Sequence, residues 1–265
     1  MSGRSERYLE EMGLAPVWKL RGPKREPAPG IRDREKKFGE APPVASKPPP
    51  RRRPPEILPP VPGLVGAARL DLADDRAARI LRMDWPELKE TVATCQACGL
   101  RKTCTQTVFG VGDEKADWLL VGEAPGAEED ARGEPFVGQA GRLLDNMLAA
   151  IGLACGENVY ICNVLKCRPP GNRNPEPFEV GQCTPHLLRQ LELIKPKLIL
   201  AMGRFAVQAL LNTEASIASL RGRLHRYQGV PLIVTYHPAY LLRNLPDKAK
   251  AWEDLCFARR SIAAL

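Results

Sequence analysis

Short apolar runs alternate with segments of helical spacing from about residue 84 to the end of the chain. A short apolar run that stops at a glycine or a polar side chain is typical of a buried parallel strand. Four such runs are present, at Leu119–Gly122, Asn158–Asn163, Lys197–Met202 and Pro231–Tyr236. Helical spacing follows Asp84 and recurs at Gly141–Gly152, Pro185–Ile194, Arg204–Leu211 and Asp247–Ala264. This alternation predicts one α/β domain over residues 84–265, a three-layer α/β/α fold with a central, mainly parallel four-stranded sheet.

Polar side chains stand at the ends of three of these strands. The first strand runs into Gly122-Glu123-Ala124-Pro125-Gly126, the second ends on Asn163, and the fourth is followed by His237. The carboxyl ends of parallel strands meet at one edge of a sheet, where open α/β folds bind their ligands. We therefore expect Glu123, Asn163 and His237 to converge on one site.

The N-terminal 83 residues have a different composition from the rest of the chain. Residues 1–82 hold 14 of the 26 prolines, and proline at this density disfavours helices and sheets alike. We predict a Pro/Arg-rich disordered tail or linker over residues 1–83. Its alternative roles are a nonspecific DNA tether through Arg51, Arg52 and Arg53, or a docking segment for a partner that the sequence does not identify.

Charge and cysteine content bear on compartment and partners. The formal net charge is +8, and residues 1–85 carry 18 Lys and Arg against 12 Asp and Glu. The folded part is therefore nearly neutral, and any nucleic-acid contact there must use local basic clusters. No apolar run is long enough to cross a membrane, and the N-terminus has no apolar leader segment. We expect a cytoplasmic protein in which cysteines act as ligands or core residues.

Four of the eight cysteines have spacings that suggest a metal centre. Cys95 and Cys98 form a C-x-x-C pair. Cys167 and Cys183 lie far downstream, with 15 residues between them. This wide, asymmetric set favours an iron–sulfur cluster over zinc, although zinc stays possible. Cys104 is the main competing ligand. The other three, Cys155, Cys162 and Cys256, follow core patterns.

Several motifs together resemble the family 4 uracil-DNA glycosylases, the iron–sulfur branch of the uracil-DNA glycosylase superfamily. The similarity runs from about Thr94 to Arg260. The motifs that carry it are Cys-Gln-Ala-Cys-Gly-Leu (95–100), Val-Phe-Gly-Val-Gly (108–112), Val-Gly-Glu-Ala-Pro-Gly-Ala-Glu-Glu-Asp (121–130), Pro-Phe-Val-Gly (135–138), Asn-Val-Leu-Lys-Cys-Arg-Pro-Pro (163–170) and Tyr-His-Pro-Ala-Tyr-Leu-Leu-Arg (236–243).

The resemblance implies a DNA repair enzyme that flips uracil out of DNA and hydrolyses its N-glycosidic bond. It also implies a structural 4Fe-4S cluster on Cys95, Cys98, Cys167 and Cys183. The loop between the last two cysteines then becomes a candidate DNA-backbone surface. Lys166, just before this loop, and Arg168 and Arg173 within it are expected to reach phosphates.

The chemistry of excision assigns roles to the residues at the strand ends. The expected uracil pocket consists of Gly122, Glu123, Ala124, Pro125, Phe136, Asn163 and His237. The Asn163 amide matches uracil O4 and N3–H, a pattern that cytosine reverses. Phe136 offers a ring face to the flipped base, and His237 is expected to donate a hydrogen bond to uracil O2 as charge develops there.

One position departs from the better-known branches, which carry an aspartate where this chain has Ala124. Water or cation stabilisation must then come from Glu123, from Glu129 or from DNA phosphates. At the DNA surface, Leu241 and Leu242 are candidates for a wedge into the gap left by the base, and Arg243 for a phosphate contact.

Two other functions stay open. One is a catalytically silent DNA-binding protein that recognises uracil or abasic sites, and the other is an electron-transfer protein. A covalent branch of the superfamily carries a basic insertion ending in histidine, and residues 168–177 contain no histidine, which disfavours it. We expect a monomer that acts on uracil-containing DNA and has no membrane partner.

Overall fold

The computed structural model describes residues 75–264. Most of the predicted tail therefore lies outside the described residues. Within the described residues, Asp75–Ile80 forms helix α2, which packs against helix α6 (Pro177–Ile194). Helix α3 (Trp85–Ala93) follows, and the Asp84 side chain caps it by accepting a hydrogen bond from the Glu87 backbone at 2.9 Å, as predicted.

A single sheet forms the middle layer, in the order β1-β3-β2-β4-β6-β5. Its four inner strands are the predicted ones and are mutually parallel: β2 (Trp118–Gly122), β3 (Val159–Asn163), β4 (Leu198–Met202) and β6 (Val230–Thr235). The prediction of four strands was incomplete, because an antiparallel strand is added at each edge. These are β1 (Val111–Gly112) and β5 (Leu224–Tyr227).

Both edge strands have simple local causes. Strand β5 pairs with β6 through the two-residue turn Gln228-Gly229, where φ is 49° and 83°. Two successive residues of positive φ make the hairpin turn whose twist suits antiparallel strands. Strand β1 pairs with β3 over two residues, and a Cβ at Gly112 would lie 2.2 Å from the Val159 carbonyl oxygen. Glycine there allows the close approach of the two backbones.

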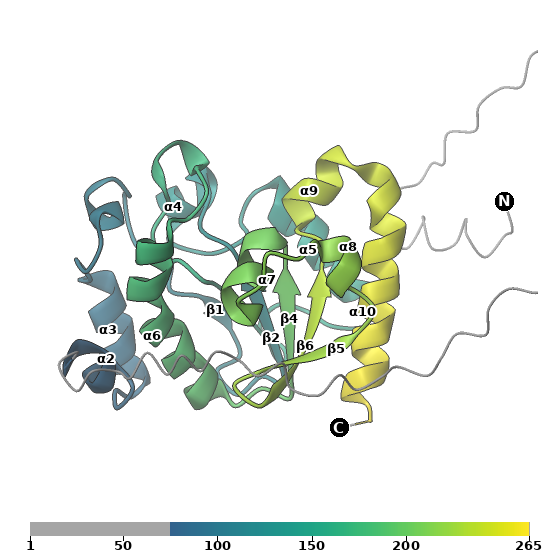
Figure 1. The fold of residues 1–265 in the computed structure, drawn as a ribbon, viewed down its shortest axis with the longest axis horizontal. Helices are drawn as coiled ribbons and strands as arrows, with labels where there is room; N and C mark the ends of the chain where they lie inside the picture. The colour runs from purple at the N-terminus through teal and green to yellow at the C-terminus, as the bar shows by residue number, and fades with distance from the viewer. Residues whose placement is uncertain (1–74, 265) are drawn as a thin grey trace, which may run out of the picture. The chain divides into compact units, whose positions relative to one another are not determined.

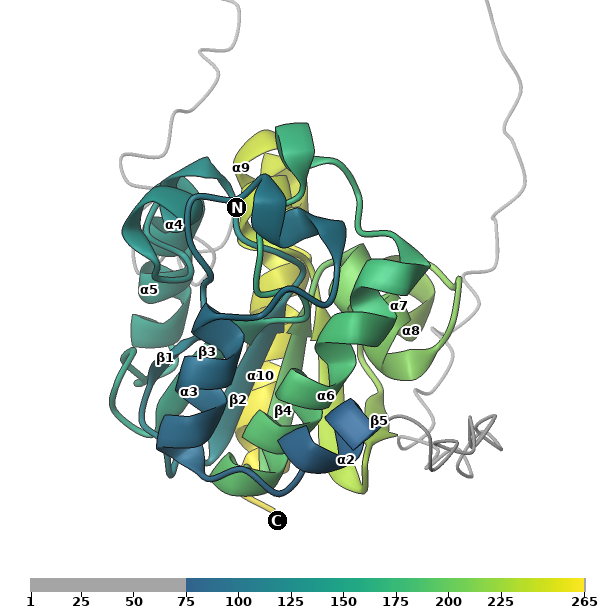
Figure 2. The ribbon, with the colours of Figure 1, turned by 90° about the vertical axis from the view of Figure 1, so that its left-hand side faces the viewer.

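Helices cover both faces of the sheet, so the predicted three-layer architecture is confirmed (Figures 1 and 2). On one face lie α6 and α7 (Arg204–Leu211), and on the other lie α5 (Gln139–Ala149) and α10 (Lys248–Ile262). The short helix α8 (Ile217–Leu220) contacts β6. The strands β2, β3 and β4 are buried along their whole length. No helix among residues 75–264 is long and apolar enough to span a bilayer.

Several further helices are short. They are α4 (Ala127–Arg132), α9 (Pro238–Arg243), and the 3-10 turns η1 (Gly99–Lys102), η2 (Pro170–Asn172) and η3 (Leu245–Asp247). In Figure 1 the arrowheads of β4 and β6 point toward the side where α9 lies. Helix α6 begins at Pro177, eight residues earlier than predicted, and continues through Pro185. Cys183 therefore lies on a helix.

Candidate active site and metal centre

A cleft of about 790 Å³ opens at the carboxyl ends of the parallel strands. Glu123, Asn163 and His237 all line it, so the structure brings together the three polar side chains that follow β2, β3 and β6. The other predicted pocket residues on its wall are Ala124, Pro125, Glu129 and Phe136. Gly122 lies just beneath, at the end of β2.

Asn163 is a buried residue on the wall of the cleft. Its side chain is 3% exposed, and its Oδ1 has no hydrogen-bond partner among the described residues. Beyond β3 the chain keeps contact with the β2 turn, because the Val164 N–H donates to the Gly122 carbonyl at 3.0 Å. A Cβ on Gly122 would lie 2.3 Å from Asn163 Oδ1 and 3.0 Å from Phe136 Cζ. A buried acceptor without a hydrogen-bond partner destabilises the folded protein. Because Asn163 lines the cleft, a bound ligand can supply that partner.

Phe136 is fixed in a backbone conformation that few non-glycine residues adopt, with φ of 57°. A Cβ on Gly141 would lie 1.5 Å from the Phe136 carbonyl oxygen, so α5 holds this loop by close backbone contact. The Phe136 ring stacks on the His237 ring, with centroids 5.4 Å apart and an interplanar angle of 27°. Strain at a cleft residue of this kind is typical of a functional position.

His237 forms the N-cap of α9, and its Nδ1 accepts a hydrogen bond from the Ala239 N–H at 3.2 Å. Burial, with a contribution from the Arg243 charge, lowers the pKa of His237 to about 4. The imidazole is therefore neutral near pH 7, and its proton lies on Nε2 because Nδ1 is an acceptor. A Cβ on Gly203 would lie 2.8 Å from His237 Cβ, so glycine at the end of β4 allows the ring to lie there.

Two carboxyl groups line the cleft and differ in their surroundings. Burial raises the pKa of Glu123 to about 7, opposed by the charge of Arg204. Glu129 instead accepts the Gly126 N–H at 3.0 Å and so caps the start of α4. Arg204 lines the same cleft and lies over the Phe205 ring at 4.4 Å. Arg204 is not among the predicted site residues, because an arginine at a helix start carries no local signal of function.

The four predicted ligand cysteines surround one small cavity below the loop that follows β3. Cys95, Cys98, Cys167 and Cys183 all lie on its wall. Among residues 75–264, no three Cys, His, Asp or Glu side chains lie close enough together to hold a single metal ion. Burial raises the pKa of the Cys98 and Cys167 thiols, and that of Cys183 to about 11. Cys104 is buried beside Cys167 and Cys183 but does not line the cavity.

Cationic and neutral polar groups complete this cavity. Lys166 and His186 line it and are both almost fully buried, at 2% and 1% exposure. The Lys166 backbone N–H donates to Cys183 Sγ at 3.4 Å. A guanidinium nitrogen of Arg76 donates to Cys95 Sγ at 3.6 Å and lies 3.1 Å from His186 Nε2. Burial, followed by the charges of Arg76 and Lys166, lowers the pKa of His186 to about 3.

The predicted phosphate-binding loop needs correction at Lys166. Its ammonium group is buried and donates to the Asn163 carbonyl at 2.8 Å and to Gln190 Oε1 at 2.6 Å, so it does not reach the surface. Arg173 lines the cleft but forms two hydrogen bonds with the Glu179 carboxylate, at 2.9 and 2.5 Å. Arg168 is half-buried and donates to Asn172 Oδ1 at 2.7 Å.

The predicted wedge needs a similar correction. Leu241 is fully buried in the main core, whereas Leu242 is 38% exposed. Successive residues on a helix point about 100° apart, so only one of the pair faces outward. Arg243 lies beside Leu242 at the exposed end of α9 and lines the cleft.

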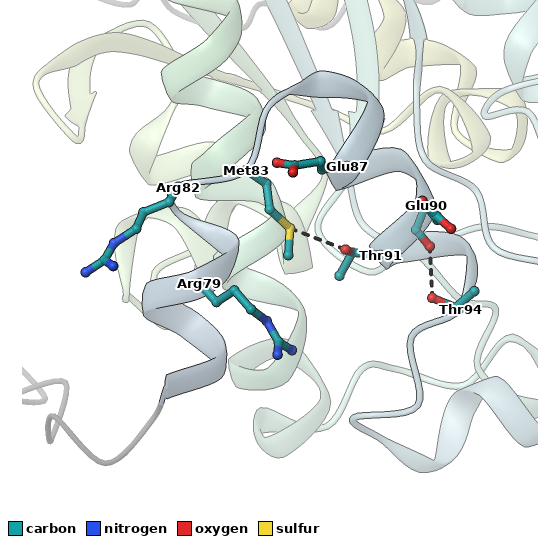
Figure 3. A pocket seen from close by; sticks show the side chains of 7 residues that line it. All are labelled: Arg79, Arg82, Met83, Glu87, Glu90, Thr91 and Thr94. Carbon is teal, nitrogen blue, oxygen red and sulfur yellow. Dashed lines mark hydrogen bonds between the residues drawn. The ribbon is translucent and has the colours of Figure 1, made fainter.

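A second depression lies between α2 and α3, away from the strand ends. Arg79, Arg82 and Glu90 are among the residues on its wall, and Thr91 donates to the Met83 sulfur at 3.3 Å (Figure 3). It contains none of the predicted site residues.

The comparisons with known proteins agree with this geometry. The family model described as "Uracil DNA glycosylase superfamily" matches residues 109–256. A type-4 uracil-DNA glycosylase of Archaeoglobus fulgidus is 48% identical over 164 residues, which cover 59% of this chain and 82% of the relative. The corresponding Thermotoga maritima protein is 45% identical over 165 residues, covering 62% of this chain and 85% of the relative.

A type-5 uracil-DNA glycosylase of Pyrobaculum aerophilum is more distant. It is 32% identical over 151 residues, which cover 50% of this chain and 66% of the relative. The chain therefore belongs to the uracil-DNA glycosylase superfamily, and within it to the type-4 family.

Proposed function

We propose that this protein is a monofunctional uracil-DNA glycosylase that hydrolyses the bond between uracil and deoxyribose and leaves an abasic site. The observation that carries the proposal is the buried Asn163 Oδ1, which has no partner among the described residues and opens into the cleft that Phe136 and His237 also line. A base flipped out of the DNA stack supplies the missing partner.

Asn163 accounts for the choice of base. Its Oδ1 accepts the N3–H of uracil while its amide N–H donates to O4. Cytosine presents an acceptor at N3 and a donor at its 4-amino group, so the same amide would face two mismatched groups. A site built around one hydrogen-bond pattern rejects the reversed pattern strongly, because buried groups are left unpaired. The Phe136 ring supports the base from one face.

His237 accounts for the acceleration of bond cleavage. As the bond between uracil N1 and the sugar C1′ breaks, its electron pair passes to the base and negative charge builds on O2. The Nε2–H of the neutral His237 ring donates to that oxygen. Because this charge is largest in the transition state, a donor fixed in advance lowers the barrier. Water then adds to C1′ and loses a proton.

Glu123 is our first candidate for assisting the water and the sugar cation. Its carboxyl group lines the cleft, and a pKa of about 7 makes it an effective proton acceptor near neutral pH. Glu129 is the second candidate, although one of its oxygens is bound to the Gly126 N–H. On the DNA side, we assign Leu242 to the gap left by the base and Arg243, Arg168 and Arg173 to phosphates.

We further propose that Cys95, Cys98, Cys167 and Cys183 hold a 4Fe-4S cluster. Four thiols around one cavity fit such a group, and their sulfurs are too far apart for a single ion. The buried Lys166 ammonium has no carboxylate within ion-pair distance among residues 75–264, and an anionic cluster offsets its charge. The bound cluster supplies a structural cross-link, which fixes the loop between Cys167 and Cys183 to the rest of the domain.

The test is incubation of the purified protein with an oligonucleotide that contains one uracil, beside matched cytosine and thymine strands. We expect free uracil and an alkali-labile site from the first strand alone, and about four irons per chain. Tight binding of uracil DNA without release of the base would instead support the silent DNA-binding alternative. Reversible reduction of the cluster without any base release would support electron transfer.

A further inference from the structure

Helix α2 places a side chain against one of the four cysteines, although this helix lies outside the residues that the family model matches. The Arg76 guanidinium donates to Cys95 Sγ at 3.6 Å and to the Gln182 carbonyl oxygen at 3.2 Å. The same guanidinium nitrogen that reaches Cys95 lies 3.1 Å from His186 Nε2. Arg76 thus joins α2 to the C-x-x-C segment and to two residues of α6.

The direction of these hydrogen bonds favours a negatively charged sulfur. A guanidinium group only donates, so Cys95 Sγ and the Gln182 oxygen both act as acceptors. A thiolate accepts such a bond more strongly than a thiol does, because the bond is then charge-assisted. His186 Nε2 is also an acceptor here, which fits the neutral ring that burial enforces.

The charge balance of the cavity points the same way. Lys166 and Arg101 line the cavity, and Arg76 reaches Cys95 at its wall. None of the three cations is in an ion pair with a carboxylate in the described part of the chain. The one acid nearby, Glu179, is bound to Arg173. Four thiolates around a 4Fe-4S core in its resting state carry a net charge of about −2, and cations at the cavity offset that charge.

We infer that Arg76 is a positioning residue for the cluster, which fixes the Cys95 sulfur and stabilises the negative charge of the four-thiolate group. The inference rests on the cluster assigned under the proposed function. It makes α2 part of the metal centre, so that retention of the cluster depends on a helix upstream of the C-x-x-C pair. Hydrogen bonds and nearby positive charge stabilise the reduced state of such a cluster and slow its oxidative loss.

A purely structural role for Arg76 is the competing explanation. Helix α2 also docks through Ile80 and Ala77, which are 0% and 2% exposed. An Ile80→Val variant weakens this docking without changing any group near the cysteines. Arg79 lies on the same helix and lines the depression between α2 and α3, so Arg79→Gln removes a positive charge from α2 without touching Cys95 (Figure 3).

The experiment compares the full-length protein with Arg76→Gln, Arg76→Lys, Arg79→Gln and Ile80→Val. Iron content is measured first, then the rate at which visible absorbance is lost to an iron chelator in air, and the reduction potential of the cluster. We expect Arg76→Gln to lose iron about 10-fold faster and to have a lower potential. Arg76→Lys should recover part of both, and the two control variants should match the wild type.

Each outcome decides between the explanations. The inference is overturned if Arg76→Gln loses iron at the wild-type rate and its cluster has an unchanged reduction potential. Equal acceleration in Ile80→Val, again at an unchanged potential, assigns Arg76 to docking alone and also overturns it. A wild-type protein without iron contradicts the cluster itself, a failure of the proposed function that the iron assay detects before any variant is compared.

Discussion

The Ala239 N–H donates a hydrogen bond to Nδ1 of His237 at 3.2 Å, which leaves Nε2 of that ring to carry the proton. Because the pKa of His237 is about 4, the ring should stay neutral from pH 8 down to about pH 5. Nitrogen-15 NMR should therefore show the Nε2–H tautomer and no titration near pH 6.5. Titration of His237 near that value would contradict the assigned donor.

Replacing the His237 ring should lower the rate of bond cleavage more than the affinity for DNA. We expect His237→Ala to lower the single-turnover rate of uracil release by roughly 10²–10³-fold, the range for losing one transition-state donor. Iron content and affinity for uracil DNA should change little. The matched control is His225→Ala, which removes a half-buried ring whose Nε2 lies 2.8 Å from the Leu220 carbonyl oxygen. Equal effects of both variants would exclude a specific role for His237.

A methyl group at Gly122 should disrupt base recognition without touching the base. The added Cβ would lie 2.3 Å from Asn163 Oδ1 and 3.0 Å from Phe136 Cζ, so both side chains must shift. We expect Gly122→Ala to reduce uracil excision by at least 10-fold, since small displacements in a fixed site are costly. Gly99→Ala, where a Cβ meets nothing within 4 Å, should be neutral. Wild-type excision by Gly122→Ala would refute the packing argument.

Glu123 should control the pH dependence of the reaction. If its carboxylate assists water, the single-turnover rate should rise with pH through about 7, and Glu123→Gln should abolish that rise. Stability should change in the opposite direction. A raised pKa means that the folded state holds its proton more tightly, so this contribution is complete below the unfolded pKa and is lost as pH rises through about 7.

Thermal unfolding across this range provides the check on Glu123. Above pH 7 the Glu123→Gln variant should gain stability relative to the wild type, because the variant has no carboxylate to ionise in the cleft. An unchanged rate profile in Glu123→Gln would move the assignment to Glu129 or to the DNA phosphates.

The two leucines of α9 should behave differently. Leu241 is fully buried, so Leu241→Ala should destabilise the fold by about 2–5 kcal/mol. Leu242 is 38% exposed, so Leu242→Ala should leave the melting temperature nearly unchanged and slow excision from duplex DNA more than from single strands. Chemical denaturation and single-turnover assays on both substrates separate the effects. Equal slowing on single and double strands would exclude the wedge.

Local pattern was sufficient for the centre of the fold and for the residues at its edge. An apolar run followed by a polar residue predicts a buried strand whose end is exposed, and this places Glu123, Asn163 and His237 in one cleft. The edge strands carry too little pattern for such a prediction. Strand β1 has two residues, and β5 forms only because the turn at Gln228 and Gly229 folds it back onto β6.

Tertiary packing determines which side chains are buried and what they contact, and local sequence does not predict this. Lys166 looks like a surface cation in a basic loop, yet Gln190, 24 residues later on α6, covers its ammonium group. Leu241 and Leu242 are alike in sequence, and only the docking of α9 separates them. Arg76 lies upstream of every recognised motif, and its contact with Cys95 depends on how α2 packs against α6.

The most direct test of the account is the specificity of Asn163→Asp. We predict that the wild type releases uracil alone, and that the aspartate variant excises uracil at least 10-fold more slowly and begins to release cytosine, because a carboxylate accepts from the 4-amino group. Single-turnover assays on matched uracil and cytosine strands measure both rates. Undiminished uracil release by the variant, with no action on cytosine, would contradict the claim that the Asn163 amide reads the base.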